Sequence, residues 1–112
     1  MMNPRFNLWI EIKDEVVLSS WRVKLLKAID LSGSISSAAE IMDVPYRRAW
    51  ERINEMESRL GYHLLETEIG GSGGGGAVLT PKAKDLIKRF EFFENGLDQE
   101  IHQRFMKAFL EE

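Results

Sequence analysis

Apolar and polar residues alternate near the start of the chain, which is the period of a half-buried strand. Between residues 6 and 12 the apolar side chains fall at every second position, while Trp9 lies on the more polar face. We expect Trp9 to cover an edge or a partner surface. A turn at 13–15 and a short returning strand at 16–18 are predicted to follow.

Helical spacing then replaces the alternation, and the pattern predicts a first helix that ends at Gly33. Ser19 or Ser20 can accept hydrogen bonds from the free amides at its start, and Gly33 suits the left-handed residue that stops a helix. A second, short helix is expected next, because Ser37 followed by Glu40 has the form of a capping box. Two alanines between them allow another helix to cross closely.

A turn at 43–45 leads into a third helix that is expected to run to about Leu60. Pro45 suits its first position, where the missing amide costs nothing. At about 100° per residue, one side of this helix is apolar and carries Ala49, Ile53, Met56 and Leu60. The opposite side carries Arg47, Glu51 and Ser58, with Arg48 on one margin and Tyr46 and Trp50 on the other.

Two short strands, at 64–69 and 77–79, flank the glycine run GGSGGGG at 70–76 and predict a hairpin. The run fits the dinucleotide pattern GxGxxG, but a strand follows where that motif needs a helix. A flexible connector, including an engineered linker, is one interpretation. The other is a wing whose tip, at Gly73 and Gly74, brings bare backbone amides close to a phosphate.

Thr80 and Pro81 open a last helix that is predicted to continue to the end of the chain, with a bend or break at Gly96. Its apolar stripe is longer than one small domain normally covers, which predicts burial against a second copy. The residues expected in this dimer interface are Leu86, Phe90, Phe93, Leu97, Ile101 and Phe105.

The order of elements predicts a mainly α fold with a small β hairpin, namely a winged helix-turn-helix with a long C-terminal dimerisation helix. One domain is expected from 112 residues. Residues 1–80 would form the winged helix-turn-helix with its N-terminal strand, and residues 81–112 the C-terminal helix.

Composition excludes several other classes of protein. The chain is 44% apolar and 29% charged with a net charge of −3, so any affinity for nucleic acid must come from local placement of charge. It contains no cysteine, and the two histidines are isolated, so no metal site, cofactor or enzyme activity is predicted. The N-terminus lacks a continuous apolar segment, and we expect a cytoplasmic protein that does not enter a membrane.

Arg47 and Arg48 are the main candidates for binding DNA, since an arginine offers a two-pronged donor that fits guanine. Glu51 can pair with either of them, so spacing alone supports DNA reading and an ordinary solvated helix face equally. Arg52 and Lys82 are further candidates, for contacts with phosphates.

Two segments taken together resemble the N-terminal DNA-binding domain of the ModE family of molybdate-responsive transcription regulators, and more distantly LysR-type regulators. They are LLKAIDLSGSISSAAEIMDVPYRRAWERINEME at 25–57 and GGSGGGGAVLTPKAKDLI at 70–87. The resemblance implies a homodimer on a palindromic operator in double-stranded DNA. It also implies that the segment from Tyr46 to Trp50 lies in the major groove, and that Ser36 and Ser37 meet phosphates.

Two departures from the family pattern qualify the resemblance. Pro45 stands where the family often has serine, so a cap or a phosphate contact is expected to be lost there. Full regulators continue into oxyanion-binding domains, whereas this chain stops at Glu112. The expectation is therefore a sequence-specific, homodimeric transcription regulator that lacks a molybdate-binding domain and has an unknown effector. The alternative is a winged-helix protein-interaction module without DNA binding, which would use the last helix or the Trp9 face.

Overall fold

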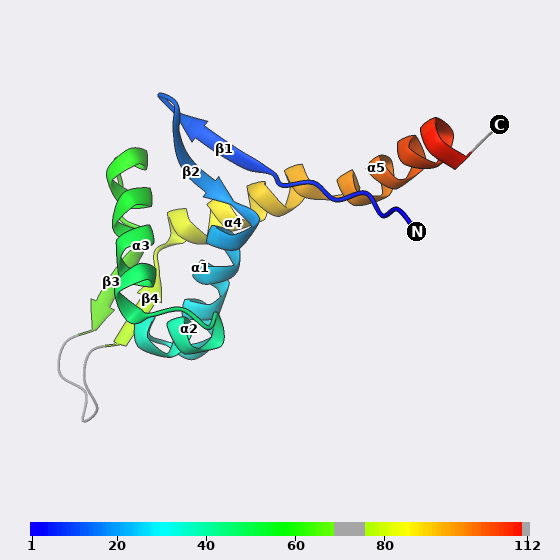
Figure 1. Cartoon of the computed structure of the whole chain (residues 1–112). Coiled ribbons are helices and arrows are strands. Elements are labelled where there is room, and N and C mark those ends of the chain that lie inside the picture. Colours follow the sequence, from blue (N-terminus) through cyan, green and yellow to red (C-terminus); the bar gives the residue numbers. More distant parts are fainter. Residues whose placement is uncertain (69–75, 111–112) are drawn as a thin grey trace.

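The computed structural model describes residues 1–68 and 76–110, and this part of the chain is mainly helical with two small antiparallel hairpins (Figure 1). Three helices form the core, the N-terminal hairpin contacts the C-terminal end of the third helix, the second hairpin lies beside that helix, and a helical arm leaves the core. The predicted fold class, a winged helix-turn-helix, is confirmed.

The N-terminal hairpin pairs β1 (Trp9–Ile12) with β2 (Glu15–Ser19). Its two-residue turn has positive φ at both Lys13 and Asp14, the geometry that matches the twist of two adjacent strands. The predicted alternation is confirmed, with residues 10 and 12 packed against the core and Trp9 exposed. The strand begins later than expected, and Phe6 lies outside it.

The three core helices are α1 (Ser20–Ser32), α2 (Ile35–Ile41) and α3 (Tyr46–Leu60). Ser19 caps α1 by accepting from the amide of Arg22, and Gly33 ends it with a φ of 84°, as predicted. Along α3, the three residues Ala49, Ile53 and Met56 are buried, which confirms the predicted apolar side.

The predicted start of α2 is wrong. Its cap is Ser34, whose Oγ accepts from the amide of Ser37 at 3.0 Å, and the helix begins at Ile35. Ser34 directly follows Gly33 and has an extended backbone, which places its hydroxyl over the first turn of α2. Ser37 lies inside the helix and therefore does not cap it. Pro45 is likewise the N-cap of α3 instead of its first helical residue, because its ψ of 145° is extended.

Small residues let the helix-turn-helix close tightly. Ala38, Ala39 and Ala49 are at most 2% exposed, so α2 and α3 approach each other without a long side chain between them. Larger apolar side chains complete the core around this crossing: Val17, Leu25, Leu26, Ile29, Met56 and Leu64. Their burial removes apolar surface from water and supplies most of the driving force for folding.

The second hairpin pairs β3 (Leu65–Glu68) with β4 (Gly76–Leu79) in antiparallel register. The amide of Ala77 donates to the carbonyl of Gly33 at 2.8 Å, so β4 is fastened to the end of α1. Residues 69–75 lie outside the described part of the chain, and Gly73 and Gly74 are among them.

The C-terminal arm consists of α4 (Pro81–Glu94), α5 (Leu97–Phe105) and one π-helical turn, η1 (Met106–Leu110). Thr80 caps α4, and the predicted break occurs at Gly96, whose φ is 83°. The long helix is therefore two helices. Lys27 pairs with Glu91 of α4 at 2.8 Å. Figure 1 shows α5 extending beyond the core, which makes the molecule 64 Å long and 29 Å wide.

Phe90 was predicted to lie in a dimer interface, but it is 2% exposed within its own chain. The reason is that α4 packs on α1, so this part of the stripe covers the core of the same molecule. Leu86 also packs against that core. The hydroxyl of Ser20 donates to Glu94 in the last turn of α4, which holds α4 on α1 along its length.

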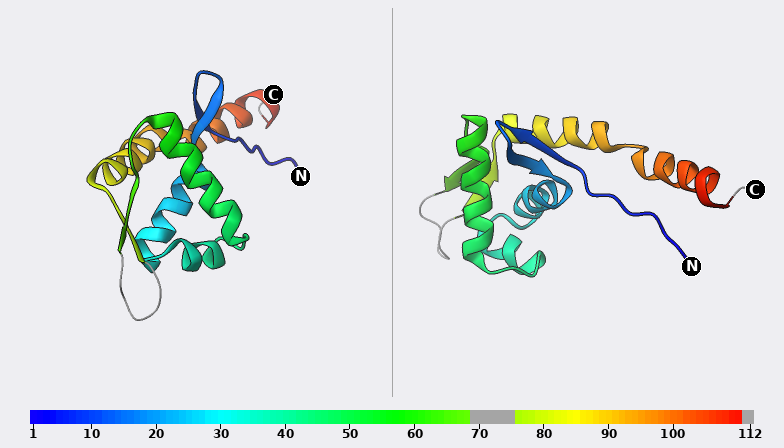
Figure 2. Two further views of the ribbon diagram at one scale, coloured as in Figure 1. Left: turned by 90° about the vertical axis from the view of Figure 1, so that its left-hand side faces the viewer. Right: turned by 45° about the horizontal axis from the view of Figure 1, so that its top comes forward.

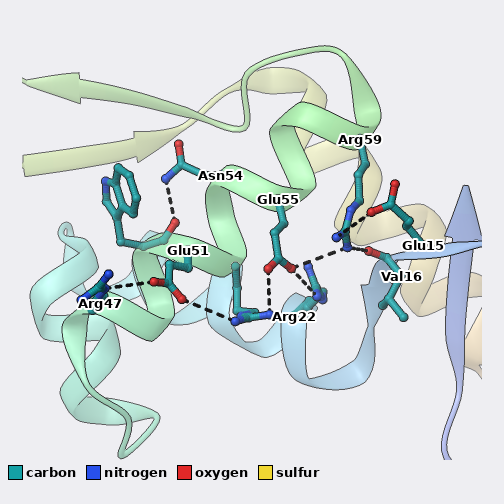
Figure 3. A network of polar contacts seen from close by, with 10 residues as sticks. Glu15, Val16, Arg22, Arg47, Glu51, Asn54, Glu55 and Arg59 are labelled. Carbon is teal, nitrogen blue, oxygen red and sulfur yellow. Dashed lines mark hydrogen bonds and ion pairs between the residues drawn. The ribbon is translucent and has the colours of Figure 1, made fainter.

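A buried ion pair sets the position of α3 (Figure 3). The guanidinium of Arg22 on α1 is 9% exposed and contacts the Glu55 carboxylate on α3 at 2.9 Å. Glu55 also holds Arg52 at 2.8 Å and Arg59 at 3.5 Å. Arg59 in turn donates to the carbonyl of Val16 and pairs with Glu15, so the same carboxylate links α1, α3 and β2.

We predict that Glu55→Ala lowers the free energy of unfolding by about 3 kcal/mol, because it leaves Arg22 buried without an opposite charge. Urea denaturation followed by circular dichroism at a fixed protein concentration measures this loss. Glu91→Ala is the matched control, since it removes an exposed partner of Lys27 and is expected to cost less than about 1 kcal/mol. Equal losses in both variants would contradict the prediction.

Candidate nucleic-acid interface

The first two turns of α3 carry the largest group of exposed side chains on the helix-turn-helix. Arg47 is 87% exposed, Tyr46 is 54% exposed and Trp50 is 49% exposed, and Arg48 is also exposed. Ala49, in the middle of this segment, faces the core. In the left view of Figure 2, α3 lies on the outer face of the molecule with the β3–β4 hairpin beside it. The structure thus brings together four of the predicted site residues.

Carboxylates compensate the positive charge along the rest of α3. The Nε of Arg47 donates to Glu51 at 3.0 Å, whereas Arg48 has no ion pair with any residue in 1–68 or 76–110. Arg52 was predicted to contact phosphate, but Glu55 and Glu51 hold it and its side chain is only 32% exposed. Arg52 is therefore an internal cation of α3, because carboxylates three residues after it and one before it surround its guanidinium.

Asn54 is a further exposed polar residue on α3 that the sequence pattern did not single out. Its Nδ2 donates to the carbonyl of Trp50 at 2.7 Å, which leaves the amide oxygen facing solvent. It lines an open cleft between α3 and the N-terminal hairpin, together with Glu15, Trp50, Glu51, Glu55, Ser58 and Arg59. The signal available in the sequence was its spacing, four residues after Trp50. Asparagine can pair with the major-groove edge of adenine.

The serines predicted to meet phosphates lie in the first turn of α2. Ser36 is exposed, while Ser37 is partly buried and its amide already donates to Ser34. Of the two, only Ser36 presents an open side chain.

Lys82 stands apart from α3, in the first turn of α4 at the base of the wing. Its Nζ lies 4.9 Å from the centre of the Tyr62 ring, in a cation–π contact. Burial and the charge of Asp85 raise the pKa of Tyr62, while Arg89 acts against this shift. Arg89 donates to Asp85 at 2.7 Å, and this hydrogen bond raises the pKa of Arg89. Lys82 therefore places a cation beside the wing, whereas the charge of Arg89, further along α4, is paired with Asp85.

The remaining predicted interface residues follow the arm outward. Phe93 is 53% exposed, and Leu97, Ile101 and Phe105 are partly exposed along one side of α5. No residue of α5 or η1 is buried. The ring of Phe105 lies 5.2 Å from that of Phe109, so the apolar side continues into η1.

The described residues contain neither a candidate metal site nor a membrane-spanning helix. Within residues 1–68 and 76–110, no three His, Cys, Asp or Glu side chains are grouped so that they could hold a metal ion. Across the same ranges, no helix is long and apolar enough to cross a membrane.

Comparisons with known proteins identify a family and a similar fold for this chain. A family model described as "Bacterial regulatory helix-turn-helix protein, lysR family" matches residues 21–84. ArgP from Mycobacterium tuberculosis has a similar fold, with a TM-score of 0.53 and 20% identity over 74% of this chain and 30% of that one.

Several relatives are similar in sequence. The "DNA-binding transcriptional dual regulator ModE" of Escherichia coli is 39% identical over 90 residues, which cover 80% of this chain and 34% of that protein. ModE of Haemophilus influenzae is 33% identical over 91% of this chain and 40% of its own length. The "Molybdenum-pterin-binding protein MopB" of Rhodobacter capsulatus is 41% identical over 68% of this chain and 28% of its own length. The chain thus spans about a third of the length of these relatives.

The predicted ModE-like helix-turn-helix is confirmed by these matches, and the family and its named members support the predicted class of function, a DNA-binding transcription regulator. The family match covers more than half of the chain and includes α2 and α3 entire. This chain therefore belongs to the LysR-type family of bacterial regulatory helix-turn-helix proteins and is similar in sequence to ModE regulators.

Proposed function

We propose that the chain binds double-stranded DNA in a sequence-specific manner, as a homodimer in the cytoplasm, and regulates transcription. The observation that carries this proposal is the exposed pair Arg47 and Arg48 in the first turn of α3. Their side chains project from the helix that a helix-turn-helix protein inserts into the major groove. The other arginines of α3, Arg52 and Arg59, are paired with carboxylates and help to fix the helix on the rest of the domain.

Each group in this surface has a separate role in the proposed complex. Arg47 and Arg48 contact base edges, and Asn54 offers an amide one to two turns further along α3. Ser36 in α2 and Lys82 beside the wing contact phosphates, which set the register without reading sequence. Tyr46 and Trp50 supply flat apolar surface against sugars or thymine methyl groups.

The arm supports the homodimer. Leu97, Ile101 and Phe105 recur at every fourth residue along α5, and the described residues of the single chain leave them partly exposed. Phe93 extends the same surface toward the core. A second copy of α5 packed against this side removes it from water, and such a two-fold arrangement presents two α3 helices to a palindromic site.

The alternative function, a protein-interaction module, draws support from the carboxylates. Glu15, Glu51 and Glu55 line the cleft beside α3 and oppose a polyanion. Sequence-specific DNA binding is favoured because these three carboxylates are already paired with arginines, whereas Arg48 has no carboxylate partner within residues 1–68 and 76–110. Measurement of DNA binding separates the two functions directly.

The first test of DNA binding uses duplexes selected by the wild-type protein from a random pool. Arg47→Ala plus Arg48→Ala is expected to weaken binding to the selected duplex by at least about 30-fold, since each arginine–base contact is worth about 1–3 kcal/mol. Fluorescence anisotropy at several salt concentrations measures the affinity and its salt dependence.

The control for this test removes the same charge elsewhere. Lys24→Ala plus Lys107→Ala alters one exposed residue of α1 and one of η1, both outside α2, α3 and the wing. It is expected to change the affinity by less than about threefold, because salt screens charges more than about 8 Å away. Absence of wild-type binding at low salt, or equal affinity of the arginine variant, would rule out the proposal.

A second test addresses the dimer. Ile101→Asp places a charge in the middle of the proposed interface without disturbing the core, so the protein is expected to sediment as a folded monomer at micromolar concentration. Its affinity for a two-half-site duplex is then expected to fall to that for a single half-site. Gln103→Asp adds the same residue on the exposed opposite side of α5 and is expected to remain dimeric. If Ile101→Asp sediments like the wild type, α5 is not the interface.

A further inference from the structure

Glu51 occupies an unusual place on the DNA-facing side of α3, because it lies between an exposed arginine and an anchored one. Its Oε1 accepts from the Nε of Arg47 at 3.0 Å, and its Oε2 lies 3.6 Å from a terminal nitrogen of Arg52 (Figure 3). Arg47 is 87% exposed, whereas Arg52 is 32% exposed. A carboxylate here adds negative charge beside the site proposed for a polyanion.

The anchoring of Arg52 fixes the far side of this arrangement. Arg52 contacts Glu55 at 2.8 Å, and Glu55 in turn contacts the buried Arg22 at 2.9 Å. Alternating charges therefore run without a break from Arg22 in the core to Arg47 at the surface. Each member restricts the side chain of the next one outward, so Glu51 is held in place before any ligand binds.

The contact with Glu51 uses only one part of the Arg47 guanidinium. Arginine has five N–H donors, and Glu51 takes the one on Nε. The four donors on the two terminal nitrogens have no other hydrogen-bond partner in the described part of the chain. This end of the guanidinium is the pair of donors that fits N7 and O6 of guanine.

Stability does not account for the Arg47–Glu51 pair. The Arg47 side chain is 87% exposed and that of Glu51 is 40% exposed, and a pair this open to solvent contributes little to folding. The Arg47–Glu51 pair is better explained as a device that positions Arg47. A flexible arginine side chain must be ordered when DNA binds, which lowers affinity by roughly two- to tenfold. A carboxylate that orders the arginine before DNA binds removes this loss of affinity for the base that matches the fixed position of the guanidinium.

We infer that Glu51 is a positioning residue that presents the end of the Arg47 guanidinium to guanine, and that it thereby sets the base preferred at one position in each half-site. The inference rests on the proposed DNA binding. Glu51 raises the preference for one base while its charge lowers affinity for DNA of any sequence. Removing it is therefore expected to move these two quantities in opposite directions.

The test compares Glu51→Ala with Glu51→Gln. Both variants lose the same charge, but glutamine keeps an oxygen that can accept from Arg47. Binding-site selection on random duplexes gives the base preference at each position, and anisotropy on the selected duplex and its single-base variants gives the affinities. In Glu51→Ala, the preference for guanine at one position is expected to fall about three- to tenfold. In Glu51→Gln it is expected to stay closer to the wild type, and in both variants affinity for unrelated DNA rises.

Arg47→Ala identifies which position to score, because it is expected to abolish the preference there. The double variant Arg47→Ala plus Glu51→Ala is then expected to show no further loss at that position, as two residues acting on one contact should. Glu40→Ala removes an exposed carboxylate from α2 and serves as the matched control for charge. It is expected to leave every base preference unchanged.

The outcomes separate the two levels of the proposal. If the wild type selects a sequence but Glu51→Ala and Glu51→Gln both raise affinity uniformly with all base preferences intact, Glu51 acts only through its charge and the inference is wrong. If the wild-type protein binds no DNA sequence preferentially, the proposed function fails and the inference fails with it.

Discussion

The orientation of α3 depends on one carboxylate that three arginines share. Glu55 meets Arg22 from α1 and both Arg52 and Arg59 from its own helix, and Arg59 carries the connection to β2. A buried ion pair of this kind is a weak source of net stability, because removing charges from water costs about as much as their attraction returns. Its effect is geometrical, since few rotations of α3 on the core keep all these contacts.

Glu55 also determines how much positive charge α3 exposes to solvent. Four arginines stand on this helix, but the two nearer its end are turned inward by Glu55 and Glu15. The pair in the first turn stays exposed, with Arg47 held at its Nε by Glu51 and Arg48 in no ion pair within residues 1–68 and 76–110. This explains how an acidic chain with a net charge of −3 can still present a basic point on one helix. The charge total of the chain says little about this, because it counts internal and external arginines alike.

Local chemistry made much of the fold predictable, whereas contacts between distant residues did not. Ser19, Gly33 and Thr80 end or begin helices through bonds to residues at most four positions away, so their roles follow from sequence. Ser37 was the predicted cap of α2, but Ser34 caps it, because the extended backbone directly after Gly33 places the Ser34 hydroxyl over the first turn. Phe90 was misplaced because α1, on which α4 packs, is distant in sequence. Arg52 was misplaced because Glu55, which holds it, is itself fixed by Arg22 on α1. Asn54 was missed because its spacing, four residues after Trp50, is shared by many exposed helical residues.

The break at Gly96 has a consequence for the geometry of the whole regulator. Arg22 of α1 is joined to Glu55 of α3, and Lys27 and Ser20 hold α4 on α1 as far as Glu94. The direction of α5 is set two residues later, by a glycine in a left-handed conformation. In a dimer joined through α5, that direction determines how far apart the two α3 helices stand. Successive major grooves on one face of DNA repeat about every 34 Å. In such a dimer, the conformation of Gly96 would therefore set the number of base pairs between the two half-sites, although Gly96 itself lies away from the DNA.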